Sequence, residues 1–305
     1  VGLLYSAFTY YLGFEVNKGE YKMMGLAPYG NPDGELTAKY RKLITENLVT
    51  VYEDGSIWLD QQYFNYATGL RMAKDDKWEK LFGLKKRDSK DEMLSEHCDM
   101  ALAIQQVTEN IFLKMAKTAQ EKTGCKNICL AGGVALNSVA NGKLIDSGLF
   151  DEVYIQPAAG DAGGAVGAAL AAYHIFEGKE RTAIRPDAMS GSLLGSEYSD
   201  EEIESVLKEK GIKFSKAQNE TDLTDKVSDL IVSANVIGWF QGRMEFGPRA
   251  LGNRSIIADA RNPEMQKKVN LKIKFRESFR PFAPILLEED LERYFDLKLP
   301  SPYML

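Results

Sequence analysis

Residues 127–133 read Asn-Ile-Cys-Leu-Ala-Gly-Gly, and residues 153–164 read Val-Tyr-Ile-Gln-Pro-Ala-Ala-Gly-Asp-Ala-Gly-Gly. Each stretch places a short apolar run before a glycine turn. A run suited to a helix follows each turn, from Val134 to Lys143 and from Ala165 to Ala172. Two successive units of strand, turn and helix predict an α/β fold, with Cys129 inside a buried strand.

The glycine turns also offer an anion site, because the free N–H groups and the dipole at the start of a helix favour negative charge. A pair of such turns would suit a nucleotide, with one turn near the phosphate and the other leaving room for the adenosine. Helices in α/β domains also begin with glycine for packing reasons, so the turns alone leave both interpretations open. The chain has neither a Gly-Lys-Ser/Thr phosphate loop nor a clean dinucleotide fingerprint, which disfavours those two nucleotide classes.

A second stretch, residues 242–255, reads Gly-Arg-Met-Glu-Phe-Gly-Pro-Arg-Ala-Leu-Gly-Asn-Arg-Ser, and we call it the arginine loop. Residues 243–280 hold ten Lys and Arg against four Asp and Glu, whereas the whole chain has a net charge of -6. Arg249 and Arg254 lie in turns whose backbone N–H groups are free to face an anion, and an arginine fork suits phosphate. Because the chain is acidic overall and lacks a repeated stacking pattern, a small polyanion ranks above nucleic acid as the partner.

The composition predicts a cytoplasmic enzyme with more than one part. At 305 residues, with 44% hydrophobic and 27% charged residues, the chain can bury a large core and more readily two than one. No apolar run approaches the roughly 18 residues of a membrane span. The three cysteines match no zinc spacing and are expected to be reduced.

The remaining pattern predicts the order of elements along the chain. The start, from Leu3 to Val16, is predicted to be sheet-like, and a helix with one apolar stripe follows it. The stripe carries Leu94, His97, Ala101, Ile104, Thr108, Ile111 and Met115. On this stripe His97 is predicted to be packed rather than catalytic. A polar connector that includes Pro186 leads to two helices, at 200–210 and 223–233, and to a strand at 236–240.

Two long runs, 238–255 and 270–284, resemble the signature of the O-carbamoyltransferases of nodulation and antibiotic tailoring. Three further stretches, 21–30, 130–137 and 156–164, agree with it, so the resemblance spans nearly the whole chain. It implies an actin-like, sugar-kinase-like domain over 1–180, related to the tRNA threonylcarbamoyl transferases. A linker over 181–199 and the start of a YrdC-like domain over 200–305 would follow.

The resemblance also implies the chemistry. The YrdC-like domain would use carbamoyl phosphate and ATP, with its Mg²⁺, to make carbamoyl adenylate. The first domain, with iron or another divalent metal, would pass the carbamoyl group to a hydroxyl of a small-molecule or sugar acceptor. A His-x-x-x-His pair that completes the family's metal site is absent from this chain, which also lacks an initiator Met. We therefore expect a segment to be missing before Val1. The YrdC-like domain also stops at Leu305, short of the family's usual end, so we expect a C-terminal segment to be missing too and the 305-residue chain alone to be inactive.

The resemblance assigns roles to individual residues. The predicted catalytic residues, which would hold the phosphates of both substrates, are Arg249, Lys274 and Arg280. The predicted nucleotide-binding residues are Gly132, Gly133, Asn137 and Gly163, with Arg243, Arg254 and Arg276 as second choices. Those three arginines could instead pair with Glu245, Asp259 or Glu277. Asp161 is the predicted metal ligand, although an Asp before a helix also suits an N-cap.

Two other functions stay open at this point. One is a threonylcarbamoyl-type transferase of tRNA modification, which the fusion of both domain types in one chain argues against. The other is a nucleotide-binding scaffold without chemistry. The acceptor cannot be named from the sequence, and a homodimer is compatible with it.

Overall fold

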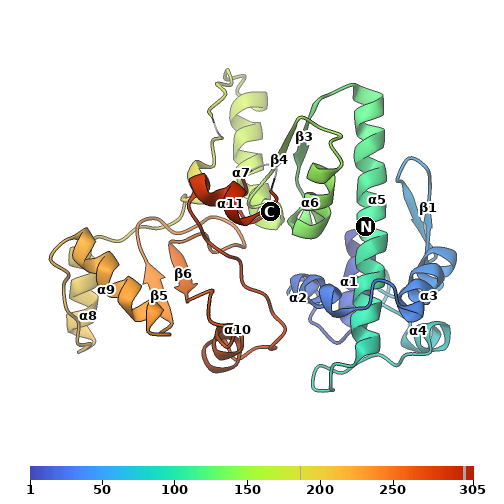
Figure 1. Ribbon diagram of the computed structural model, residues 1–305. Coiled ribbons are helices and arrows are strands. Elements are labelled where there is room, and N and C mark those ends of the chain that lie inside the picture. Colours follow the sequence, from blue (N-terminus) through green and yellow to red (C-terminus); the bar gives the residue numbers. More distant parts are fainter. Residues whose placement is uncertain (186, 298–299) are drawn as a thin grey trace. The chain divides into compact units, whose positions relative to one another are not determined.

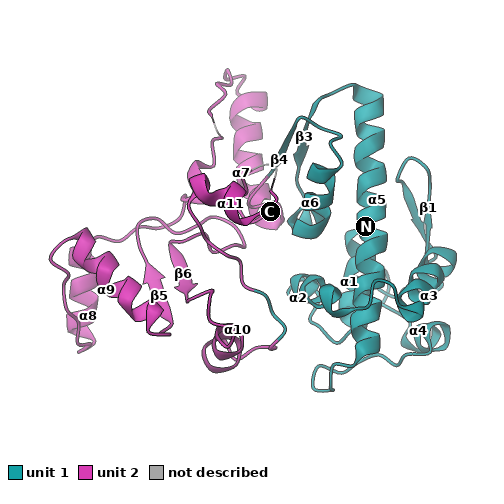
Figure 2. Ribbon diagram, in the orientation of Figure 1, with its two compact units in different colours: residues 1–155, 279–281 teal, residues 156–278, 282–305 magenta. Residues whose placement is uncertain are grey.

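The computed structural model describes residues 1–185, 187–297 and 300–305 (Figure 1). The chain forms two compact units, coloured separately in Figure 2. Unit 1 comprises Val1–Ile155 and Phe279–Pro281, and unit 2 comprises Gln156–Ser278 and Phe282–Leu305. The second glycine turn therefore shares a unit with the arginine loop. The predicted domain boundaries stay a prediction, and Pro186 of the connector lies outside the described residues.

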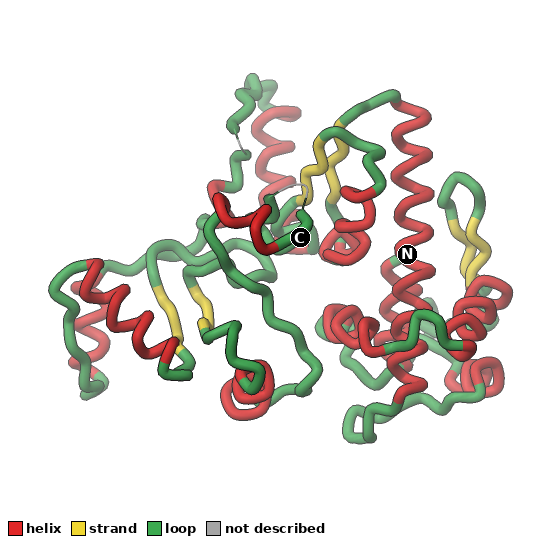
Figure 3. Tube along the Cα trace, viewed as in Figure 1, coloured by secondary structure: helices red, strands yellow, loops and turns green. Residues whose placement is uncertain are grey.

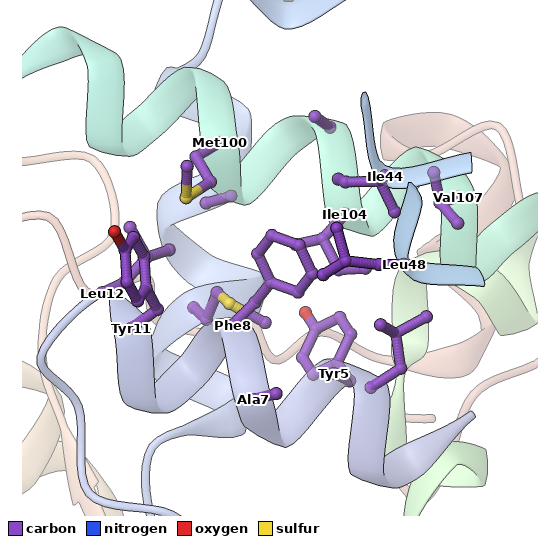
Figure 4. Close-up of a cluster of buried hydrophobic side chains, with 14 of the residues drawn as sticks. Tyr5, Ala7, Phe8, Tyr11, Leu12, Ile44, Leu48, Met100, Ile104 and Val107 are labelled. Carbon is purple, nitrogen blue, oxygen red and sulfur yellow. The ribbon is translucent and has the colours of Figure 1, made fainter. Parts of the chain in front are cut away.

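Unit 1 is built around one long helix, α5 (Ser95–Thr123). Four shorter helices precede it in the same unit, namely α1 (Gly2–Tyr11), α2 (Glu20–Leu26), α3 (Glu35–Leu43) and α4 (Asp75–Phe82). Short helical turns η1 (Ala27–Tyr29) and η2 (Ile44–Leu48) and a hairpin of β1 (Val49–Val51) with β2 (Ile57–Leu59) complete its first part. Figure 4 shows the core, where Phe8 of α1 packs among Met100, Ile104 and Leu48. The ring of Trp78 packs against that of Phe8 at a tilt of 53°, with the ring centroids 4.7 Å apart.

The sheet-like start predicted from Leu3 to Val16 is wrong, because residues 2–11 form α1. The apolar residues recur with helical spacing, and Leu4, Phe8 and Tyr11 are fully buried on one face. The many aromatic and apolar residues of this segment suggested a strand, but burial against α5 decides for the helix. Tertiary packing therefore overrides local composition here.

The predicted long helix is confirmed as α5, and His97 is a packed residue of its first turn. Its Nδ1 accepts a hydrogen bond from the backbone N–H of Leu94 at 2.9 Å. Burial, followed by the charge of Arg87, lowers the pKa of His97. The ends of the predicted stripe, Leu94 and Met115, are exposed.

The predicted strands around the glycine turns are also confirmed. Strand β3 (Asn127–Leu130) pairs in parallel with β4 (Glu152–Ile155). After the first turn comes a short 3-10 helix, η3 (Gly133–Leu136), and α6 (Ser138–Asp146) starts four residues later than predicted. Cys129 is exposed, so its predicted burial is wrong. The reason is that exposed and half-buried side chains alternate along β3, which leaves one face of this strand uncovered.

Unit 2 contains the helices and the strand predicted after the connector (Figure 3). It opens with α7 (Asp161–Ala171) and η4 (Ala172–Phe176) and continues through η5 (Ser190–Ser192) to α8 (Asp200–Glu209) and α9 (Glu220–Val232). Strand β5 (Ile237–Phe240) pairs antiparallel with β6 (Arg254–Ile257), and the two strands flank the arginine loop. The last elements are α10 (Met265–Lys268), η6 (Val269–Ile273), η7 (Glu288–Asp290) and α11 (Leu291–Tyr294).

Sequence-local capping explains where α8 and α9 begin. The hydroxyl of Ser199 accepts from the N–H of Glu202, whose carboxylate accepts from Ser199 in return. The Asn219 side chain caps α9 by accepting from the N–H of Asp222.

The fold as a whole is mixed α/β, with three two-stranded sheets in the described residues. Its actin-like and YrdC-like assignments stay predictions, and no helix of the described chain is long and apolar enough to cross a membrane.

Candidate functional site

The first glycine turn is open in the described structure. A Cβ added to Gly132 or Gly133 would meet no heavy atom of the described residues within 4 Å. Gly132 has a φ of 98°, which L side chains rarely adopt, so its backbone alone favours glycine. Gly133 has no such constraint. Neither position shows the packing that the structural interpretation of the turn requires.

Asn137 is held in a buried network of side-chain amides. Its Oδ1 accepts from Gln105 Nε2 and from the N–H of Ala140, both at 3.1 Å, and its Nδ2 donates to Gln105 Oε1 at 3.0 Å. The hydroxyl of Tyr5 donates to the same Gln105 oxygen at 2.8 Å. Asn137 therefore caps α6 and fixes the end of the turn segment. Its predicted contact with a nucleotide is untested.

A charge pair between the buried Glu109 and the half-exposed Lys143 extends this network. Gln105 Nε2 donates to Glu109 Oε1 at 2.9 Å, and Glu109 also forms an ion pair with Lys143 of α6. Burial, followed by the charge of Glu109, raises the pKa of Tyr5. Neither Gln105 nor Glu109 was predicted as part of the site. Their signal in the sequence is two polar residues four apart, a spacing that places both on one face of α5.

The second glycine turn differs from the first, because packing requires its glycine. A Cβ at Gly163 would lie 2.1 Å from the carbonyl oxygen of Ala158, a contact that backbone atoms cannot relieve cheaply. Gly160 is the N-cap of α7, and the exposed Asp161 is the first helical residue. The N-cap interpretation of Asp161 is therefore wrong by one position.

Asp161 does not belong to a preformed metal site in this part of the protein. Within residues 1–185, 187–297 and 300–305, no three His, Cys, Asp or Glu side chains gather closely enough to hold a metal ion. A tight divalent site needs three or four protein ligands. The described residues thus do not fit the implied metal, and its binding by Asp161 stays a prediction.

The arginine loop closes around the carboxylate of Glu245. Its Oε1 accepts from the backbone N–H groups of Leu251 at 2.7 Å, Asn253 at 2.8 Å and Arg254 at 3.3 Å. The sequence-based expectation that the N–H groups in these turns are free for an external anion is wrong for these three. Burial raises the pKa of Glu245, but the backbone hydrogen bonds outweigh it and the net shift is downward. The loop therefore carries its own internal anion.

Two of the loop's arginines brace its backbone. Arg254 donates to the carbonyls of Gln241 at 2.7 Å and Gly242 at 3.1 Å, and its guanidinium lies 3.5 Å from the ring centroid of Phe240. Arg243 donates to the carbonyl of Gly195 at 3.2 Å. Arg243 and Arg254 thus support the loop. Their predicted role at the nucleotide is untested.

Residues of the predicted linker also hold the loop. The N–H of Gly195 donates to the carbonyl of Met244, and the N–H of Met244 donates to the carbonyl of Ser196, both at 2.9 Å. The N–H of Phe246 donates to the carbonyl of Ser192. A segment about fifty residues upstream in the chain therefore forms one wall of the loop.

Arg249 lies near the middle of the loop and is half-buried. Burial lowers the pKa of its guanidinium. The turn before it is tightly placed, because Gly247 has a φ of 145° and its Cβ position lies 3.0 Å from the carbonyl oxygen of Pro157. This contact joins the loop to the segment before Asp161, so unit 2 brings together two of the stretches predicted to carry function.

Residues 270–278, which carry the predicted Lys274 and Arg276, are organised by the fully buried Asn270. Its Oδ1 accepts from Arg276 Nε at 2.7 Å, and its Nδ2 donates to the carbonyl of Ser278 at 3.1 Å. Arg276 also lies over the ring of Phe282, 4.8 Å from its centroid. Lys274 is exposed, and the next residue, Phe275, has a φ of 47°. A phenylalanine in this left-handed region is strained, as is common at functional sites.

Arg280 lies in unit 1, unlike Arg249 and Lys274. It is buried, and its guanidinium lies 4.5 Å from the ring centroid of Tyr21. Its neighbour Pro281 packs against Gly25, where an added Cβ would lie 3.1 Å from the proline ring. The three predicted catalytic residues are therefore divided between two units, and their convergence on one pocket stays a prediction.

Comparison with known proteins agrees with the motifs on both units. The family model described as the carbamoyltransferase N-terminus matches residues 1–170, and the model described as the carbamoyltransferase C-terminus matches residues 228–305. The chain belongs to the carbamoyltransferase family.

Three relatives show how this member of the carbamoyltransferase family compares in length. An uncharacterized protein of Synechocystis sp. is 54% identical over 100% of the chain, which covers 49% of that relative. Nodulation protein NolO of Bradyrhizobium diazoefficiens is 39% identical over 97% of the chain, which covers 50% of it. Nodulation protein NolNO of Sinorhizobium fredii is 37% identical over 97% of the chain, which covers 40% of it. The chain thus spans about half the length of these relatives.

Proposed function

We propose that the protein carrying this chain is an ATP-dependent O-carbamoyltransferase that activates its carbamoyl group as an adenylate. Membership of the carbamoyltransferase family supports a carbamoyl donor and an acceptor. The observation that carries the adenylation step is the half-buried Arg249 within the arginine loop. Backbone N–H groups near the end of the loop donate to Glu245 near its start, and Arg254 donates to the carbonyl of Gln241. A fixed, partly desolvated guanidinium suits the charge that builds on phosphate oxygens during transfer.

The chemistry can be written in three balanced steps. Water cleaves the bond between the carbonyl carbon and the bridging oxygen of carbamoyl phosphate, which gives carbamate and inorganic phosphate. A carbamate oxygen then attacks the α-phosphorus of ATP, and pyrophosphate leaves with the bond electrons. Finally, the acceptor hydroxyl loses its proton and attacks the carbamoyl carbon, and AMP leaves.

In this scheme the residues of the chain have separate roles. Arg249 and the exposed Lys274 hold phosphate oxygens of carbamoyl phosphate and ATP, and each cation stabilises the charge that moves onto pyrophosphate. The open turn at Gly132 and Gly133 receives the adenylate, because a backbone without side chains permits close approach of a phosphate. The acceptor is a hydroxyl-bearing small molecule or sugar.

The test is replacement of Arg249 by Gln in the whole protein that carries this chain, and the wild type and every variant below are that whole protein. Release of pyrophosphate from ATP should depend on carbamoyl phosphate, and Arg249→Gln should reduce it by on the order of 100-fold, as the loss of other preorganised donors does. Arg249→Gln should leave transfer from pre-made carbamoyl adenylate intact. Arg261→Gln is the matched control, because Arg261 is an exposed arginine of the same unit that pairs with Asp259 at 2.9 Å. Intact pyrophosphate release with damaged transfer would show that the arginine loop serves the other step.

A further inference from the structure

Glu245 is the feature of the arginine loop that the proposed chemistry does not use. It is a buried carboxylate, 8% exposed, within a segment rich in arginine. Its Oε1 accepts from three backbone N–H groups, those of Leu251, Asn253 and Arg254. Such a concave set of N–H groups is the arrangement that binds phosphate in many loops. Here a side chain of the loop itself occupies it.

The geometry of these contacts closes the loop. Glu245 stands near its start, whereas Leu251, Asn253 and Arg254 lie near its end. The three hydrogen bonds therefore tie the two ends together across residues 246–250, which include Arg249. Without them, these five residues, which include one glycine and one proline, would lose the anchor that joins their two ends, and each residue that becomes free regains about 1–2 kcal/mol of backbone entropy.

Other contacts fix Glu245 itself. The residue before it, Met244, exchanges backbone hydrogen bonds with Gly195 and Ser196 at 2.9 Å. The side chain of Asn253 donates to the carbonyl of Arg243 at 2.7 Å. Hydrogen bonds of the neighbouring residue Met244 and of the donor residue Asn253 therefore hold both sides of the Glu245 contact in place.

From this arrangement we infer that Glu245 is a positioning residue for Arg249. Its carboxylate fills the backbone anion site of the loop, so that an incoming phosphate meets the guanidinium of Arg249 instead of the N–H groups of Leu251 and Asn253. This inference rests on the proposed function, in which Arg249 binds phosphate. It adds that the selectivity of the loop for its substrate depends on an internal anion that never touches that substrate.

The position of the proton on Glu245 makes the inference specific. The pKa of Glu245 is lowered in the folded protein. The carboxylate therefore stays ionised at pH values where an ordinary Glu is already protonated, and it loses its charge only as the pH falls through the lowered pKa. Pyrophosphate release should therefore fall on the acid side as Glu245 is protonated. Glutamine keeps an oxygen acceptor in the same place but does not titrate.

The experiment compares Glu245→Gln, Glu245→Ala and the control Glu264→Gln, which changes an exposed glutamate of the same unit. Amide hydrogen exchange at Leu251, Asn253 and Arg254 is measured first, in the absence of substrate. Glu245→Ala should speed exchange at these three amides by at least tenfold, Glu245→Gln should largely restore protection, and Glu264→Gln should change nothing. Unchanged protection in Glu245→Ala overturns the positioning role, whatever the protein catalyses.

The second arm measures carbamoyl-phosphate-dependent pyrophosphate release against pH. Glu245→Ala should lose at least tenfold in kcat/KM for carbamoyl phosphate. Glu245→Gln, which is neutral at every pH like protonated Glu245, should show at every pH the reduced value that the wild type reaches in acid, without the acid limb that Glu264→Gln retains. A Glu245→Gln profile with the wild-type acid limb contradicts the inference but leaves the proposed function standing. Absence of pyrophosphate release from the wild type contradicts the proposed function, and the positioning role that depends on it falls with it.

Discussion

An added side chain should lower the stability of the protein at the second glycine turn and leave it nearly unchanged at the first. At Gly163, a new Cβ would lie 2.1 Å from the carbonyl oxygen of Ala158, well inside any real contact. The backbone at the start of α7 must shift to relieve it, so Gly163→Ala should destabilise the protein by about 1–3 kcal/mol, the usual cost of overpacking. At Gly133, a Cβ meets no described atom within 4 Å, so Gly133→Ala should change stability by less than about 1 kcal/mol.

Urea denaturation followed by circular dichroism measures both free energies of unfolding. Nucleotide affinity, measured by calorimetry, then separates structure from function: Gly133→Val should remain folded and lose adenine-nucleotide binding, because its side chain would fill the open turn. A stable Gly163→Ala protein would refute the packing argument. A folded Gly133→Val protein with wild-type nucleotide affinity would return the first turn to a purely structural role.

Three further outcomes follow from single contacts. Tyr5→Phe should cost about 1 kcal/mol in the free energy of unfolding, because it deletes the hydroxyl that donates to Gln105, and urea titration measures it. Asn270→Leu should cost more, about 2 kcal/mol, because it removes two hydrogen bonds that the fully buried Asn270 amide makes with Arg276 and with the carbonyl of Ser278; a wild-type unfolding midpoint would contradict this. The lowered pKa of Glu245 gives stability that is present above the ordinary Glu value near 4.5 and is lost as the pH falls through the folded value; the difference in unfolding free energy between wild type and Glu245→Gln should therefore shrink in acid.

Elements with a strong local signal could be predicted from the sequence. The apolar stripe of α5 and the capping residues Ser199 and Asn219 specify their helices through contacts within a few residues. The glycine turns that follow β3 and β4 in the chain were also predicted from the sequence. The helix at residues 2–11 was missed, because its aromatic residues suit a strand as well and only burial against α5 decides between them.

The contacts that shape the candidate site could not be predicted in the same way. The sequence from Glu245 to Arg254 does not predict that the carboxylate accepts hydrogen bonds from three backbone N–H groups instead of pairing with a neighbouring arginine. The wall formed by Ser192–Ser196 depends on a segment far away in the chain. Arg280 was grouped with Arg249 by sequence position, yet its guanidinium lies over Tyr21 in the other unit. Long-range packing sets these contacts, and local patterns do not encode it.

The central claim is that this protein makes carbamoyl adenylate, and isotope exchange between pyrophosphate and ATP tests it most directly. Without an acceptor, the adenylate can only return to ATP, so labelled pyrophosphate should enter ATP when carbamoyl phosphate is present. We predict label in ATP with carbamoyl phosphate for the wild type and the Arg261→Gln control, and its loss in Arg249→Gln. Exchange that proceeds equally well without carbamoyl phosphate, or no exchange with it, would contradict the account.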